Sequence, residues 1–301
     1  MSEFEHQGFE ARHIRQPGPR QAPRIVAVEA RGHSFAFELE PGLALLEAVR
    51  RGFATRGFTS GTLELGSMAL GPFAYVMPAL SKTGENAAFY SEIRRPAGIT
   101  RLEGGAMTFG LRDGAPFFHC HALWREADGT VAGGHILPEE AIVAEPAEVT
   151  ALALDGARFE GALDPETNFK IFGPVAGERS GNMAGRRVLA VRLRPNQDFA
   201  GALETACRDH GIARARIRGG VGSTIGARFV DGTEISNFAT EVFVSTGRVI
   251  AQPGTGISTS IDIGVIDYTG ASARGRLVNG DNPVLMTFEL VLEEDLSTPQ
   301  P

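Results

Sequence analysis

Hydrophobic and polar residues alternate over much of the chain with the two-residue period of a half-buried β-strand. This alternation predicts strands over residues 25–30, 34–39, 62–66, 73–77, 99–111, 117–125, 130–137, 148–154 and 188–193, with a turn at Gly32 between the first two. Two other stretches, residues 42–57 and 199–211, repeat their apolar positions with helical spacing and end at a glycine. The pattern therefore predicts a strand-rich protein with two principal helices.

The order of these predicted elements occurs twice. The interval from the proline before the first helix to the glycine after it, residues 41–57, is repeated by residues 195–211. Farther along, residues 134–148 align with residues 275–289 without a gap, which is typical of an internal duplication. The predicted organisation is a basic, proline-rich, disordered arm (1–24), a first domain (25–155), a linker (156–186), a second domain (187–295) and a tail (296–301).

Length and composition fit this organisation. A chain of 301 residues is long enough for two ordinary domains, and 43% hydrophobic residues, 22% charged residues and 38 glycines describe a globular protein rich in strands and turns. No apolar run is long enough for a membrane helix, and the N-terminus lacks the pattern of a secretory signal. Cys120 and Cys207 cannot form a disulfide framework, so we expect reduced thiols and a cytoplasmic protein.

The net charge of -7 argues against a general nucleic-acid coat, which requires a concentrated basic surface. The N-terminal arm is a local exception, since Arg12, Arg15, Arg20 and Arg24 are interspersed with prolines there. One interpretation is a disordered proline-rich tail, which we favour. The other is an arm that lies in a DNA minor groove. The order Gly-Pro-Arg at residues 18–20 differs from the Gly-Arg-Pro core of an AT-hook, which weakens the second interpretation.

Candidate chemistry is concentrated in residues 117–135, which read as a β-hairpin with three histidines. His119 and His121 are two residues apart on one strand, so their imidazoles leave the same face with Cα atoms roughly 6.6 Å apart. Cys120 points to the other face together with Phe118 and Trp124, which we interpret as core. The spacing of the two histidines is that of metal ligands.

His135 completes this set if the hairpin has one particular register. A loop over residues 126–130 places His135 directly across from His121, where facing Cα atoms are about 4.5 to 5.5 Å apart. A slip of one residue, for which a bulge at residues 133–134 is a plausible cause, would send His135 to the opposite face. Three converging imidazoles favour zinc, or another divalent transition metal, with one position open for water or substrate. The alternative is that the histidines are polar residues of an exposed face or a subunit contact.

The second copy lacks the histidines. His119, His121 and His135 correspond to Ser260, Asp262 and Arg276. An aspartate and an arginine at the two facing positions predict a cross-strand ion pair, which supports the register that brings His121 opposite His135. One metal site per chain, in the first domain, is therefore expected.

Two glutamates of the first copy, Glu64 and Glu148, also have counterparts in the second copy. Glu64 corresponds to Arg218, so this carboxylate is lost where the histidines are lost, and we take Glu64 as the candidate general acid or base. Glu148 corresponds to Glu289, which predicts a structural role for both. Arg112 and Arg125 flank the histidine strand and are either solvent-facing or anion-binding residues.

Short motifs in both halves resemble the plants-and-prokaryotes conserved (PPC) domain. In the first half, HxH, GGH and PxEV follow one another over residues 119–149, and in the second a GxxxAxIxGGxGS-like stretch spans residues 211–223. Two such domains would cover residues 25 to 294. The resemblance implies an α+β fold in which each domain is a curved, mainly antiparallel β-sheet packed with one principal helix.

The resemblance also implies partners and chemistry. Members commonly form trimers, plant members bind DNA through AT-hooks, and the fold group includes alpha-acetolactate decarboxylase, whose HxH pair and later histidine hold zinc. His119, His121 and His135 match those ligands by position. Two functions stay open: a zinc-dependent lyase or hydrolase acting on a small carbonyl or carboxylate compound, or a DNA-associated or ligand-sensing regulatory protein with a structural metal site. A homo-oligomer and a small-molecule ligand are expected with either.

Overall fold

The structure, a computed structural model, describes residues 12–181, 184–252 and 256–296. The first half contains β1 (Ile25–Leu39), α1 (Leu45–Ala54), β2 (Gly61–Leu65), β3 (Met68–Leu70), β4 (Tyr75–Val76), β5 (Pro78–Leu80), β6 (Ala88–Tyr90), β7 (Thr100–Arg112), β8 (Ala115–Arg125), β9 (Val131–Ile136) and β10 (Ala147–Asp155). The hairpin β11 (Ala157–Leu163) and β12 (Lys170–Ala176) follows. The second half contains β13 (Arg186–Leu193), α2 (Phe199–Asp209), β14 (Arg214–Arg228), β15 (Glu234–Gln252), β16 (Gly256–Asp267), β17 (Ser272–Arg276) and β18 (Val284–Glu294).

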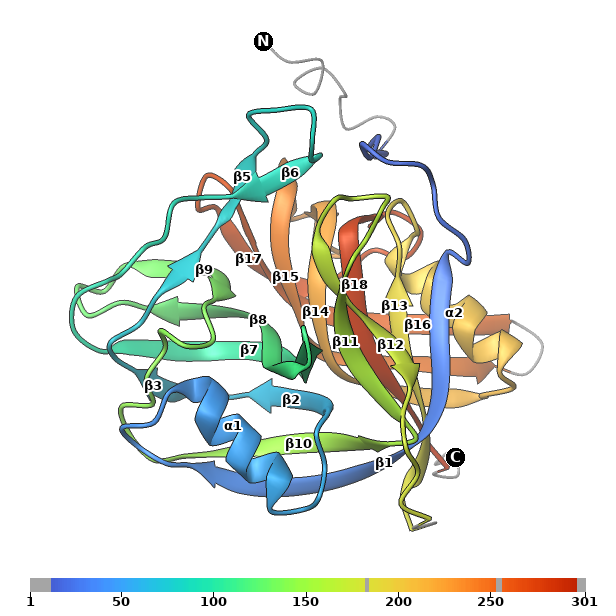
Figure 1. The fold of residues 1–301 in the computed structure, drawn as a ribbon. Helices are drawn as coiled ribbons and strands as arrows, with labels where there is room; N and C mark the ends of the chain where they lie inside the picture. Colours follow the sequence, from blue (N-terminus) through green and yellow to red (C-terminus); the bar gives the residue numbers. More distant parts are fainter. Residues whose placement is uncertain (1–11, 182–183, 253–255, 297–301) are drawn as a thin grey trace.

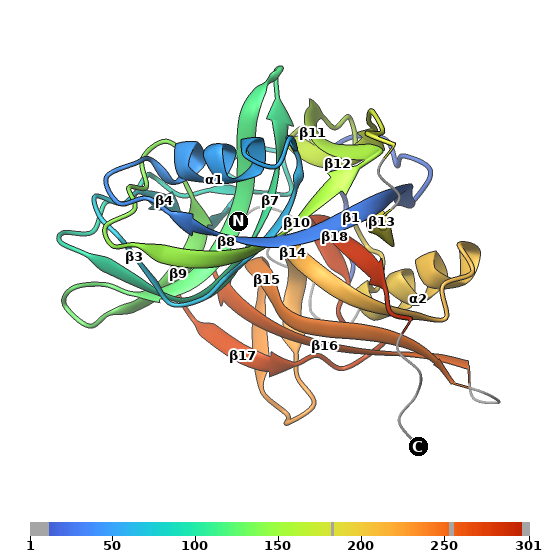
Figure 2. The ribbon, with the colours of Figure 1, turned by 90° about the horizontal axis from the view of Figure 1, so that it is seen from below.

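One mainly antiparallel sheet runs through both halves in the order β17-β16-β15-β14-β18-β13-β1-β10-β2-β7-β8-β9-β4. The halves join where β1 pairs with β13 on one side and with β10 on the other. Figure 1 shows α1 in front of β2 and β10 and α2 beside β13 and β16, and Figure 2 shows from below that the two helices lie well apart. This is the α+β, mainly antiparallel architecture that was predicted.

Each helix packs its apolar face on its own half of the sheet. In α1, Leu45, Val49 and Phe53 are fully buried, and the ring of Phe53 lies 4.8 Å from that of Phe109. In α2, the N-terminal Asp198 carboxylate accepts a hydrogen bond of 2.8 Å from the Gly201 amide, which satisfies one amide of the first turn. The core of the first half also takes in Val221, Phe243 and Ile266 from the second, so the two halves share apolar packing.

The expected turn at Gly32 is wrong, because β1 continues through this residue as a single strand of 15 residues. A Cβ atom at Gly32 would lie 2.6 Å from Cγ1 of Val188. The glycine therefore permits close packing beside β13 rather than a change of direction.

Residues 156–186, expected as a linker, contain a β-hairpin that belongs to the sheet. β11 pairs with β12 and, in parallel, with β7, while Phe159 and Phe172 are buried against Leu152 and Val188. Figure 1 shows this hairpin between the two halves. The sequence pattern missed these two strands of seven residues each; β12 contains Gly173 and Pro174, which interrupt the alternation.

The arm was expected to be disordered, and for residues 12–24 this is also wrong. Ile14 is 5% exposed and Gln16 is 8% exposed, and the Gln16 amide donates a 2.7 Å hydrogen bond to the carbonyl of Leu285. Arg24 forms an ion pair of 2.7 Å with Glu166. Residues 1–11, and the expected tail beyond Leu296, lie outside the described residues. Within the described part of the chain, no helix is long and apolar enough to cross a membrane.

Candidate metal centre

The histidine hairpin has the predicted register. His121 on β8 and His135 on β9 are direct Cα partners, and His119 lies two residues earlier on the same face of β8. One potential ligand atom from each of the three histidines lies within 4.8 Å of the others. A Cβ at Gly134 would meet the carbonyl oxygen of Val76 at 2.4 Å, so this glycine allows β4 to pair beside His135. The three side chains could hold one metal ion.

The opposite face of β8 is core, as predicted. Phe118, Cys120 and Trp124 are 0% exposed. The Trp124 ring packs edge-on against Tyr75 at 4.7 Å and Phe73 at 5.0 Å. This packing holds the strand rigid behind the histidines, which is what a preorganised ligand set requires.

Hydrogen bonds on the outer side orient two of the imidazoles. Nδ1 of His119 contacts the carboxylate of Glu289, and Nδ1 of His121 lies 3.1 Å from the carbonyl oxygen of Val242. The Nε2 atoms of the two rings therefore face each other, 2.9 Å apart. Metal-binding histidines commonly use their second ring nitrogen in this way, on a carboxylate or a backbone carbonyl.

His135 has a buried Nδ1 with no hydrogen-bond partner among the described residues. An unsatisfied buried nitrogen is costly and calls for an explanation. A metal ion held by the three rings would explain this nitrogen. The three histidines therefore fit the zinc ion that the sequence leads us to expect.

A second carboxylate lies on the inner side of the histidines. Oε2 of Glu241 is 2.6 Å from Nε2 of His121, the nitrogen that faces His119. Glu241 is on β15 and Glu289 on β18, so both carboxylates come from the second half of the chain. The first half thus supplies the imidazoles and the second half the acidic groups beside them.

The glycines of β14 make this approach possible. A Cβ at Gly222 would lie 2.3 Å from the carbonyl oxygen of Thr287 and 2.7 Å from Cδ2 of Phe288, so there is no room for a larger residue at this position beside β18. Gly222, Thr287 and Glu241 line the cavity together with the histidines. The glycine-rich stretch of residues 219–223 lies within β14 and allows close packing against neighbouring residues.

Burial controls the protonation of the site. It places the pKa values of His119 and His135 well below their usual range, and neighbouring histidines add to the effect. Burial also lowers the pKa of His121, but Glu241 outweighs it, so that pKa is raised. Burial raises the pKa of Glu289 to about 8, although Arg192 and His121 oppose the change. His119 and His135 are therefore neutral at pH 7, the form in which imidazole binds a metal.

The histidines line a cavity of about 160 Å³. Its walls are mostly apolar and come from Phe89, Phe117, Phe169, Phe172, Leu285 and Met286. The ring of Tyr90 lies 5.3 Å from that of His135. Arg112 and Lys170 are the cationic residues of the lining. The site is thus a small apolar chamber with the ligand cluster on one wall and positive charge on another.

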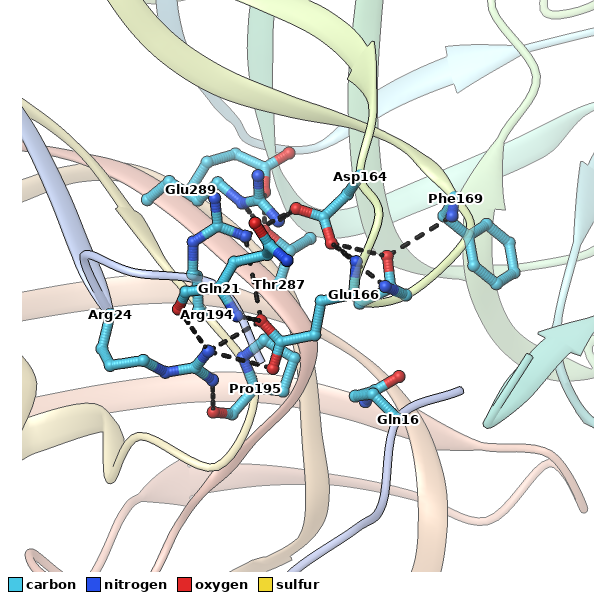
Figure 3. A network of polar contacts seen from close by, with 12 residues as sticks. Gln16, Gln21, Arg24, Asp164, Glu166, Phe169, Arg194, Pro195, Thr287 and Glu289 are labelled. Carbon is cyan, nitrogen blue, oxygen red and sulfur yellow. Dashed lines mark hydrogen bonds and ion pairs between the residues drawn. The ribbon is translucent and has the colours of Figure 1, made fainter. Parts of the chain in front are cut away.

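The polar side of Glu289 continues into a buried network, shown in Figure 3. Thr287 Oγ1 lies 3.5 Å from the Glu289 carboxylate and accepts a 3.2 Å hydrogen bond from Arg192 Nε. Arg192 and Arg194 each donate to Oδ2 of Asp164, at 2.7 and 2.6 Å. Asp164 begins the β11–β12 turn that carries Phe169 into the cavity.

Glu64 does not lie with the histidines. Its carboxylate is half exposed and accepts a 2.8 Å hydrogen bond from Nε of Arg218. It lines a separate polar groove with Asp262 and Arg276, the predicted cross-strand pair, which are Cα partners and form an ion pair of 2.9 Å.

Sequence reasoning missed Glu241 and Glu289 as site residues. The repeat pairs Glu289 with Glu148, and a glutamate present in both copies predicts a structural role. In fact Glu148 is exposed and Glu289 is 0% exposed against His119. One signal in the sequence could have found Glu289. The second copy lacks the histidines but keeps this glutamate, which is compatible with a role for it beside the histidines of the first copy.

Comparisons with known proteins give a partial picture. No family model matches the chain, and no curated protein does. Among solved structures, a PPC protein from Pyrococcus horikoshii is similar, with 19% identity and a TM-score of 0.40 over 49% of this chain and 96% of that one. The structural neighbours thus include a PPC-domain protein.

Two further solved structures are similar over about half of this chain. A metal-containing protein from Archaeoglobus fulgidus has 21% identity and a TM-score of 0.39, and the match covers 49% of this chain and 98% of that one. A protein from Bacteroides thetaiotaomicron named as a candidate DNA-binding protein has 13% identity and a TM-score of 0.35 over 46% and 91% of the two chains. In each case half of this chain spans nearly the whole of the neighbour.

Proposed function

We propose that the chain consists of two PPC-like units in tandem whose contact forms a single metal site. Supporting this, α1 and α2 occupy corresponding places in the two halves, and the hairpin of β8 and β9 corresponds to that of β16 and β17. The histidines of the first unit meet Glu241 and Glu289 of the second. Duplication followed by specialisation would explain why one unit keeps the ligands and the other the carboxylates.

At this site we propose a zinc-dependent lyase or hydrolase reaction on a small carbonyl or carboxylate compound. The observation that carries the proposal is the cluster of three histidines with ligand atoms within 4.8 Å. Two of these rings are held from behind, and a carboxylate stands at the open side. Another divalent transition metal would be bound by the same ligands.

The residues of the chain would divide the work as follows. Zinc, when bound, supplies Lewis-acid chemistry, either polarising a carbonyl oxygen or acidifying water. Glu241 would accept the proton released from water or from the substrate, because its Oε2 lies 2.6 Å from Nε2 of His121 and Glu241 lines the cavity. Glu289 fixes the orientation of His119, and the aromatic walls exclude bulk water.

Replacing Glu241 by glutamine tests the proposed function. We expect the zinc-loaded variant to react at least about 100-fold more slowly, since a positioned general base contributes about 100- to 10,000-fold. Hydrolysis of 4-nitrophenyl acetate and release of carbon dioxide from acetoacetate serve as the two readouts, one for each reaction class.

Glu64→Gln is the matched control, because Glu64 is paired with Arg218 outside the cavity. It should react at the wild-type rate. Wild-type rates in Glu241→Gln at full zinc content, or turnover in neither assay, would count against the proposed enzyme.

The DNA-associated alternative has less support in the arm. Arg24 is engaged by Glu166, and Arg12 lies 3.3 Å from Asp281 while being 8% exposed. We therefore expect weak binding of duplex DNA in a mobility-shift titration, and its loss between about 50 and 200 mM salt. Tight binding that persists at the higher salt concentration would instead favour a regulatory protein with a structural metal.

One chain already supplies both the histidines and the carboxylates of the site. The proposed chemistry therefore does not depend on the homo-oligomer, trimeric by resemblance, that the motifs imply. That assembly stays a prediction.

A further inference from the structure

Arg112 is a cavity residue that neither the metal cluster nor the fold accounts for. It ends β7 and lines the same cavity as the histidines. Its guanidinium lies over the ring of Phe117, 4.9 Å from the centroid. Its aliphatic stem packs on Gly161 of β11, where an added Cβ would come within 3.3 Å of Arg112 Cγ. The side chain is therefore positioned by a cation–π contact with Phe117 and by packing of its stem on Gly161.

The guanidinium has no hydrogen bond or ion pair with any residue that the structure describes. Two other cations of this part of the fold, one in the cavity and one outside it, differ in this respect. Lys170, the other cation of the lining, is bonded to both carboxylate oxygens of Asp113 at 2.9 and 2.7 Å. Arg125, at the far end of β8, pairs with Glu103 and donates to the carbonyl of Gly129. Arg112 is thus the cavity cation whose donors are available to a ligand.

The rest of the cavity limits what that ligand can be. A cavity of about 150 Å³ holds a molecule of the size of benzene, and this one measures about 160 Å³. Phenylalanine rings make up much of its walls, so an occupant needs an apolar body. A planar guanidinium matches a carboxylate through two parallel hydrogen bonds. Inorganic phosphate would satisfy the charge but leave the aromatic walls unused.

We propose that Arg112 is the specificity-determining residue of this site and binds the carboxylate of a small organic acid whose apolar body fills the aromatic cavity. The inference deepens the proposed function, on which it rests, by assigning the carboxylate to Arg112 and leaving the metal side for the reacting group. In Figure 3 the labelled Phe169 marks the wall contributed by the β11–β12 turn.

The test measures binding by calorimetry with three probes: benzoate, its neutral analogue benzamide, and acetate, which has the charge without the ring. Zinc-loaded wild-type protein should bind benzoate at least tenfold more tightly than either analogue. Arg112→Gln should lose that preference over benzamide while binding benzamide as before, and Arg112→Lys should retain part of it. Arg125→Gln is the matched control and should behave as wild type, because Arg125 is paired with Glu103 outside the cavity. Each variant is compared with wild type for zinc content and melting temperature.

The outcomes separate this inference from the proposed function. Unchanged benzoate affinity in Arg112→Gln, or no benzoate binding by wild type at millimolar concentration, overturns the inference. Benzoate affinity that depends on zinc and not on Arg112 also overturns it, but leaves a metal site standing. If the wild-type protein binds no zinc but binds benzoate, and this binding is lost in Arg112→Gln, the inference is supported and the proposed metal chemistry is refuted.

Discussion

The His121→Ala variant is expected to lose its zinc, whereas wild-type protein purified without a histidine tag should contain about one equivalent per chain by elemental analysis. His121 stands at the centre of the cluster, since its Cα pairs with that of His135 and its Nε2 faces that of His119. Loss of an outer hydrogen-bond partner alone typically costs 10- to 100-fold in metal affinity. Loss of a ligand should lower the affinity by more than about 100-fold.

A control histidine makes this measurement specific. His210 follows α2 in the second half, away from the cluster, so His210→Ala should retain the full equivalent. The triple alanine variant of the cluster gives the baseline. Stoichiometric zinc in that triple variant would contradict the assignment of the ligands.

The hairpin that carries the histidines was predictable because its determinants are local. Alternation over β8 and β9 assigns faces, and a short turn sets the register. The complementary pair of Asp262 and Arg276 in the second half gave independent support for that register, and the two residues do face each other. The hairpin itself spans residues 117–135, so its own pattern is enough to predict it and the second half only adds support.

The two carboxylates, Glu241 and Glu289, were not predictable in the same way, because their position depends on contacts between strands that are far apart in the sequence. Glu289 lies 170 residues along the chain from His119, which it contacts, and Val242, the residue after Glu241, lies 121 residues from His121. The order of the strands in the sheet brings β15 and β18 to the histidines. Hydrophobic periodicity predicts individual strands but not their order. Glu241 and Glu289 sit in apolar strands, so locally they resemble polar interruptions of a core.

The arm and the β11–β12 segment were misjudged for a related reason. Proline and arginine composition argues for disorder, but it does not reveal partners elsewhere in the chain. Gln16 finds the Leu285 carbonyl, and Arg24 finds Glu166. Glu166 lies in the turn after Asp164, so the arm and the hairpin order each other. Composition alone cannot detect such mutual burial.

Asp164→Asn is expected to destabilise the fold more than any surface charge change. The Asp164 side chain is 2% exposed, and its Oδ2 accepts from both Arg192 and Arg194. Its Oδ1 accepts from the backbone amides of Glu166 and Thr167 at 3.0 and 3.1 Å. Removing one charge of a buried pair leaves the other uncompensated, which costs about 3 to 5 kcal/mol. Urea denaturation of wild type and variant at pH 7 would measure the difference.

Glu160→Gln, in β11, is the matched control. Glu160 pairs with Arg158 at 2.9 Å with both side chains about two-fifths exposed, so its loss should cost less than about 1 kcal/mol.

The effect of Asp164 on stability should also depend on pH. Burial raises the pKa of Asp164, but Arg192 and Arg194 outweigh this and lower it below its usual value. A carboxylate with a lowered folded pKa stabilises the fold above its unfolded pKa of about 3.9 and loses that contribution as the pH falls through the folded value. The gap between wild type and Asp164→Asn should therefore be constant from about pH 6 to 8 and narrow below about pH 4. A gap below about 1 kcal/mol at pH 7 would contradict the stabilising role of Asp164, because a buried charge left without its partner costs several times more.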